Sequence, residues 1–327
     1  MSGKIMTSRV LLFVSLVLLI LILPFNYAVA QEGNGTIRGR VINDTPNGGS
    51  VEDITVTIYM YVDNQMAGYS SKSTDEQGEF EFTYVATETD YVISAEYQDV
   101  DYYHSVLFEP GNITAYVEIP VCDVTTNDEL IKVQMAHTIL QVNEDDVEVT
   151  EVLQLTNTGN KTFRNGEGGM AFTLPEGACD FGSTADLMQD FIVKENNQVA
   201  YLVPFPPGER SLIYSYRIPR DGTDNLRLLL SIDYPTESLD VLVSGSDVEV
   251  STKDLMPAEP VKNDSGDHYV HFWVGNVMKG ATLTLGISAA LGHSDATSAA
   301  LWIVAALLVA LFTGCILFWV RERRRQR

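Results

Sequence analysis

Apolar and polar residues alternate along most of the chain between positions 31 and 290. In the run 54–62, for example, isoleucine, valine and methionine side chains on one face alternate with threonine and tyrosine on the other. A period of two is the pattern of a half-buried β-strand. The same pattern returns in the runs 79–84, 91–97, 226–232, 239–243 and 283–287, and turn sequences such as 46–49, 76–78 and 221–222 lie between the runs. The pattern predicts an all-β fold, with weak helical character only at 183–191.

The strand pattern divides at a polar, turn-rich stretch near residues 120–130. We expect a first β-sandwich in residues 31–121 and a second, Ig-like β-sandwich in residues 122–290. The first region holds nine of the fifteen tyrosines and predicts seven short strands. The second region is longer and carries more loops, and the two regions do not repeat one another.

Two apolar runs flank the strand-rich region and predict export and anchoring. Residues 1–30 combine two basic residues, an apolar run and a small-residue cleavage sequence, the layout of a signal peptide; an uncleaved N-terminal anchor is the alternative. Residues 299–320 carry no charge and are long enough for a transmembrane helix across a hydrocarbon core of roughly 30 Å. Five arginines in the basic tail 321–327 predict that this tail is cytoplasmic. The chain is therefore expected in the cell membrane as a single-pass protein with its N-terminus outside, and 291–298 as a short polar linker.

The region expected outside the cell is strongly acidic. Without Lys4, Arg9 and the tail 321–327, the 21 basic and 44 acidic residues of the chain fall to 14 and 43, a net charge of −29. Such a surface argues against nucleic acid and against direct contact with anionic lipid headgroups. It permits cation binding, basic partners or simple solubility. We expect no nucleic-acid partner.

Candidate chemistry in the expected ectodomain is sparse. Cys122 and Cys179 are the two cysteines of this region, and they can form a disulfide or remain two separately buried thiols. His268 and His271 fall on opposite faces of a strand, which is poor geometry for sharing a metal ion. The segment 143–146 offers oxygen ligands for calcium, but it lacks the spaced ligand set of a calcium loop and indicates an acidic hairpin turn. We expect no catalytic residues, no cofactor and no metal.

One acidic residue breaks the strand pattern. Val147, Val149, Leu153 and Leu155 share one face of a strand, and Glu151 falls on the same face. A lone buried carboxylate is costly and needs a partner or a raised pKa. We expect a β-bulge beside Val152 that turns Glu151 outward. The alternative is an inward Glu151 paired with a buried arginine such as Arg210 or Arg217.

Four ordered segments of the first region, 35–41, 56–59, 73–82 and 91–93, carry a family resemblance. Asp75 and Gly78 predict a tight hairpin turn in which the aspartate caps the backbone and the glycine takes positive φ. Phe80 and Phe82, which follow, are expected to point both rings into the core. The series resembles the carboxypeptidase regulatory-like (transthyretin-like) β-sandwich domain of bacterial and archaeal surface proteins.

The resemblance covers about a quarter of the chain. It implies a carbohydrate-binding-like fold and a role as a stalk, spacer or binding module, and it does not imply catalysis. Segments 151–159 and 206–216 of the second region resemble the Ig-like ectodomains that precede C-terminal membrane anchors.

A stripe of small residues in the expected membrane helix bears on assembly. Ala306, Ala310 and Gly314 recur every four residues, a spacing that lets two helices approach closely in lipid. We therefore consider a dimer or a partner helix, in addition to the contact of this helix with the lipid bilayer.

The function expected from these observations is that of a non-enzymatic surface or envelope protein whose β-sandwiches serve binding or spacing. One alternative is an accessory subunit of a membrane transport, secretion or assembly complex. Another is a carbohydrate-binding module that uses the tyrosines of the first region. The partner outside the cell would then be a protein or a glycan, and an apolar patch on the second region would favour the protein.

Overall fold

The computed structural model describes residues 34–62, 65–184, 188–220, 225–245, 248–262 and 268–289. The predicted signal peptide 1–30, linker 291–298, transmembrane helix 299–320 and tail 321–327 lie outside the described residues, as does the stripe of Ala306, Ala310 and Gly314. No helix among the described residues is both long enough and apolar enough to cross a membrane.

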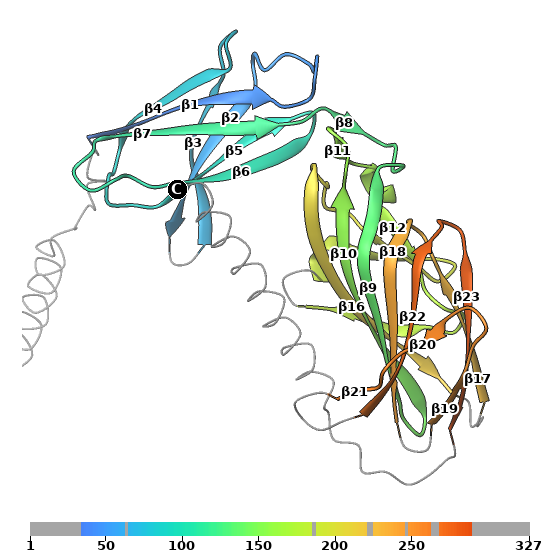
Figure 1. Cartoon of the computed structure of the whole chain (residues 1–327). Helices are drawn as coiled ribbons and strands as arrows, with labels where there is room; N and C mark the ends of the chain where they lie inside the picture. The colour runs from blue at the N-terminus through green and yellow to red at the C-terminus, as the bar shows by residue number, and fades with distance from the viewer. Residues whose placement is uncertain are drawn as a thin grey trace, which may run out of the picture. The chain divides into compact units, whose positions relative to one another are not determined.

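The described chain is all-β, as the alternation predicts (Figure 1). Its only helical turns are two short 3-10 turns, Gly166–Gly168 and Met188–Asp190, in the part of the chain that the structure describes. The segment 183–191 is therefore not an α-helix where it is described: Ser183 ends a strand and Met188–Asp190 is one 3-10 turn. The described residues divide into two compact units, and the second comprises those from Pro120 to Ala289 together with the short segments Asn43–Ser50 and Tyr97–Val100.

Unit 1 contains two sheets, an arrangement compatible with a β-sandwich (Figure 1). One sheet has the order β4-β1-β7, formed by Glu79–Val85, Gly35–Asn43 and Thr114–Val121. The other has the order β3-β2-β5-β6, formed by Gln65–Ser73, Thr55–Val62, Tyr91–Tyr97 and Val100–Val106. These are the seven short strands that the sequence predicts. Both sheets bury alternate apolar residues, among them Ile37, Ile119, Val56, Ile58 and Ile93.

The turn before β4 has the predicted chemistry but a different position in the fold. The Asp75 carboxylate accepts the backbone N–H groups of Gln77 (2.9 Å) and Glu79 (2.8 Å), and Gly78 adopts φ +79°. Phe80 and Phe82 are both buried and meet edge to face, with ring centroids 5.9 Å apart. Because β3 and β4 belong to different sheets, the turn links the sheets and does not close a hairpin.

Unit 2 is built on an eight-stranded sheet with the order β13-β16-β10-β9-β18-β22-β20, and β21 pairs with β22 beside this path. The strands are Cys179–Ser183, Gly208–Pro219, Asp146–Asn157, Ile131–Val142, Thr236–Ser244, His268–Val277, Met256–Pro257 and, for β21, Val261–Lys262. The pairs are antiparallel except β9 and β18, which run parallel. Figure 1 shows the long strands of this sheet side by side.

Smaller sheets complete unit 2 and enclose its core. Two are three-stranded: β12-β15-β14 (Met170–Thr173, Gln198–Tyr201, Phe191–Lys194) and β17-β23-β19 (Asn225–Ser231, Thr282–Ala289, Val248–Ser251). A parallel pair joins β8 (Val124–Thr125) to β11 (Thr162–Phe163). One large cluster of apolar side chains from all three larger sheets forms the core, including Leu155, Phe172, Leu212, Val241 and Leu285.

Gly39 tests the packing of unit 1, because an added Cβ at this position would lie 2.7 Å from the Val117 carbonyl oxygen. We expect Gly39→Ala to lower the free energy of unfolding of unit 1 by about 2 kcal/mol, since backbone cannot move aside as a side chain can. Gly68 provides the control, because its added Cβ would meet only the Tyr59 ring, at 3.6 Å. Hydrogen exchange in β1 and β7 measures the effect, and equal exchange rates in the Gly39→Ala and Gly68→Ala proteins would contradict this account.

Candidate functional site

Glu151 points into the core of unit 2. In the register of the eight-stranded sheet it lies opposite Thr138 of β9 and Tyr214 of β16, and only 9% of the residue is exposed. The pairing with both neighbours is regular at this position, and the register shift in β10 comes later, between Gln154 and Leu155. The predicted bulge beside Val152 is therefore wrong, and Glu151 is not turned outward.

Hydroxyl groups, not arginines, hold the Glu151 carboxyl. Thr138 Oγ1 donates to Glu151 Oε2 at 2.8 Å, and Tyr216 OH donates to Oε1 at 3.0 Å. The two arginines proposed as partners lie elsewhere. The Arg210 guanidinium lies over the Tyr201 and Phe205 rings, with centroid distances of 5.6 and 5.2 Å. Arg217 lies within 4 Å of Asp146 and Asp180.

Burial dominates the acid–base properties of this group. Loss of solvent raises the pKa of Glu151 from 4.5 to about 7, and the hydrogen bonds from Thr138 and Tyr216 oppose the rise. Burial and the neighbouring Glu151 also raise the pKa values of Tyr214 and Tyr216 well above the ordinary value, so both tyrosines stay neutral at physiological pH. The site therefore holds one carboxyl group that titrates near neutral pH.

A cavity of about 60 Å³ lies beside Glu151. It has room for a few water molecules, since each needs roughly 10–15 Å³ on this measure. Its wall combines polar groups with aromatic and aliphatic side chains, including Thr138, Glu151, Phe172, Tyr214, Asp233 and Tyr234. Asp233 accepts the backbone N–H (2.7 Å) and the hydroxyl (2.9 Å) of Thr173, and burial raises the pKa of its carboxyl.

The opposite face of the same sheet carries a row of apolar side chains that His137 and Asp240 interrupt. The residues that lie side by side across six strands in this row are Ile213, Val152, His137, Asp240, Trp273 and Met256. Ile213 and Val152 are buried, but they are not part of the core cluster on the other face. Trp273 and Met256 are 40% and 52% exposed. Met135, next to this row, is 43% exposed. We call Met135, Val152, Ile213, Met256 and Trp273 the outer patch.

Two histidines meet Asp240 at the centre of this face. His271 Nε2 lies 2.7 Å from Asp240 Oδ1, and His137 Nδ1 lies 3.7 Å from Oδ2. The other ring nitrogen of His137 lies 3.1 Å from the sulfur of Met135. Burial lowers the pKa of His137, with Asp240 opposing and His271 adding to the shift. In the described part of the chain, no three His, Cys, Asp or Glu residues are arranged to hold a metal ion, and His268 stands exposed at the start of β22.

The acidic segment 143–146 is a hairpin turn, as predicted. Asn143 donates from its backbone to the Asp146 carbonyl (2.9 Å) and from its side chain to the Asp146 carboxylate (2.8 Å). Arg220, only 3% exposed, donates to the carbonyl oxygen of Asn143 at 2.7 Å. A guanidinium therefore already occupies the position from which a cation would approach this carbonyl.

The two cysteines are not joined in the structure. Cys122 is buried, and burial together with Asp44 raises the pKa of its thiol, whereas Cys179 is exposed on β13 at the edge of the large sheet. The structure thus has two free thiols, of which only Cys122 is buried.

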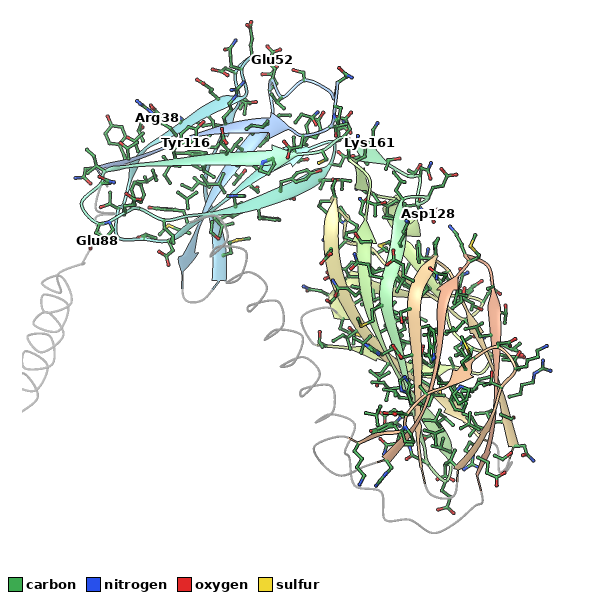
Figure 2. The ribbon with its side chains drawn as sticks, in the orientation of Figure 1. Arg38, Glu52, Glu88, Tyr116, Asp128 and Lys161 are labelled. Atoms are coloured by element: carbon green, nitrogen blue, oxygen red, sulfur yellow. The ribbon has the colours of Figure 1, made fainter. Side chains whose placement is uncertain are left out.

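Among the tyrosines of unit 1 whose side chains the structure describes, Tyr59 and Tyr103 lie near one another but do not form a flat stacking platform. The rings of Tyr59 and Tyr103 are 6.5 Å apart and tilted by 51°. Tyr84 and Tyr116 are exposed, and Figure 2 labels Tyr116 beside Arg38 on the sheet β4-β1-β7. Tyr91 is buried in the core.

Comparisons with known proteins do not assign the chain to a family. The chain matches no protein-family model, and no curated protein matches its sequence. Geometry therefore identifies the candidate sites: the buried carboxyl with its cavity, and the outer patch. Sequence patterns point to Glu151 alone, because Thr138, Tyr216 and the Asp240 cluster come together only through strand pairing.

Glu151 should make the stability of unit 2 depend on pH. Because its folded-state pKa is raised, the stabilising contribution is complete below pH 4.5 and is lost as the pH rises through about 7. We expect Glu151→Gln to have the stability of the wild type near pH 4 and to exceed it by about 3 kcal/mol at pH 8, at 1.36 kcal/mol per pKa unit. Urea unfolding of both proteins across this range measures the difference. A difference that does not change with pH would contradict the burial of an ionisable group.

Proposed function

We propose that this chain is a non-enzymatic, membrane-anchored protein whose two β-sandwiches lie outside the cell and bind a protein partner. The anchor is the expected helix 299–320 in the lipid bilayer, and the cytoplasmic part is the tail 321–327. Unit 1 would be a carboxypeptidase regulatory-like domain. Its seven strands, the capped turn at Asp75 and the buried Phe80 and Phe82 support that assignment.

The outer patch is the observation that carries the proposal. A solvent-facing sheet face normally carries polar residues, whereas this one exposes two methionines and a tryptophan. Methionine and aromatic residues are enriched in protein interfaces. The partner is therefore a different protein with an apolar surface, which also offers a polar group to Asp240 and His271 at the centre of the patch.

The position of unit 2 in the chain favours a partner at the membrane. The expected linker 291–298 is short, so unit 2 would stay near the bilayer and meet the ectodomains of other membrane proteins. This supports a role as an accessory subunit of a membrane complex. The carbohydrate-binding alternative finds less support, because the tilted Tyr59 and Tyr103 rings cannot both stack on one flat sugar face.

Crosslinking in native membranes tests the partner. A photoreactive amino acid at Met135 should give one heterologous adduct, whereas the same amino acid at Met278, which is 74% exposed outside the patch, should give none. With the crosslinked protein identified and purified, Trp273→Ala should weaken binding by about 2 kcal/mol, roughly thirtyfold, while Met278→Ala should leave it unchanged. An adduct of twice the mass of the chain would show that the partner is a second copy of this chain and would contradict the proposal of a different protein. Equal adducts at both positions, or no adduct at either, would overturn the proposal that the outer patch is a docking surface.

A further inference from the structure

The contacts of Glu151 suit an ionised carboxylate. Both of its oxygens accept hydrogen bonds, one from Thr138 and one from Tyr216. An ionised carboxylate only accepts hydrogen bonds, whereas a protonated one must also donate. The two hydroxyls therefore preorganise the site for negative charge, although burial opposes that charge.

Neither hydrogen-bond partner of this carboxylate carries a positive charge. The contacts found for Glu151 within the described residues are the two hydroxyl groups. A buried carboxylate normally pairs with a cation, and Arg210 and Arg217 have other partners. The protein thus provides the acceptor half of an ion pair next to a cavity.

The walls of the cavity favour a cation. The Phe172 ring lies 5.7 Å from both the Tyr214 and Tyr234 rings, and all three residues border the cavity. The faces of aromatic rings attract positive charge. The ammonium of Lys279 already lies 5.5 Å from the centre of the Tyr234 ring, which indicates that this ring accepts a cation. Asp233 supplies a second carboxyl group on the same cavity.

We propose that the cavity beside Glu151 binds a small organic ammonium ion, with Glu151 as its carboxylate partner and Phe172, Tyr214 and Tyr234 as aromatic walls. The volume of about 60 Å³ limits the ion to a few non-hydrogen atoms, since a cavity of about 150 Å³ holds benzene. The ion donates to Glu151 and to neighbouring oxygens in place of water. This site is on the opposite face of the sheet from the outer patch, so the two proposals can fail separately.

Binding of such an ion is linked to the release of a proton. Other titratable or charged groups that face Glu151 and its cavity are Tyr214 and Tyr216 from β16, Asp233 and Tyr234 from the segment before β18, and Lys279 above Tyr234. Burial raises the pKa values of the tyrosines, so they stay neutral at physiological pH; burial also raises the pKa of Asp233, and that of Glu151 rises to about 7. The bound cation favours ionised Glu151, so affinity should rise with pH up to about 7 and then level off.

Saturation-transfer NMR with methylammonium tests the site in the full-length protein in mild detergent. We expect saturable binding that tightens up to tenfold per pH unit below pH 7, and no saturable binding of tetraethylammonium, which exceeds the cavity. Glu151→Gln keeps the size of the side chain and one acceptor oxygen but cannot ionise, so affinity should fall at least tenfold and lose its pH dependence.

A second variant separates binding from folding. Phe172→Leu removes one aromatic wall with a modest change in volume and should weaken methylammonium binding several-fold without changing its pH dependence. No saturable signal in the folded wild-type protein would leave the cavity as a water site and overturn the proposal. Equal affinities of the wild type and Glu151→Gln would overturn the role of the carboxylate.

Discussion

The burial of Glu151 between two hydroxyl groups is the constraint on which the arrangement of unit 2 depends. Strand β10 pairs along its whole length with β9 and β16, and these two strands supply Thr138 and Tyr216. Moving either neighbour by one residue would turn its hydroxyl to the other face and leave one oxygen of the buried carboxyl without a donor. The polar contacts therefore fix a register that apolar packing alone would leave less specific.

The two faces of the large sheet reverse the usual distribution of polarity. On the inner face, an acidic group interrupts an apolar core beside a cavity, and on the outer face, apolar residues interrupt a solvent-facing surface. The buried acidic group and the exposed apolar patch each cost stability unless a ligand or partner binds there. Proteins keep such local costs mainly where they serve binding, and both of our proposals follow from that expectation.

The sequence predicts local structure better than it predicts sites. Period-two alternation identifies the strands of unit 1, and the chemistry of Asp75 and Gly78 identifies the turn before β4. Glu151 is conspicuous in the sequence, yet whether it faces inward depends on pairing with strands 13 and 65 residues away. The cluster of His137, Asp240 and His271 depends on a parallel pairing of β9 with β18, which no local pattern encodes. The same limit applies to Cys122 and Cys179, because spacing carries no information on distance.

The central claim is that unit 2 holds an ionisable carboxyl group in its core. The most direct test is a ¹³C NMR titration of the Glu151 side-chain carboxyl, assigned by its loss in Glu151→Gln. The account predicts a midpoint near pH 7, because burial outweighs the two hydrogen bonds. A midpoint near 4.5, the ordinary value for glutamate, would show that water reaches the carboxyl and would contradict the account.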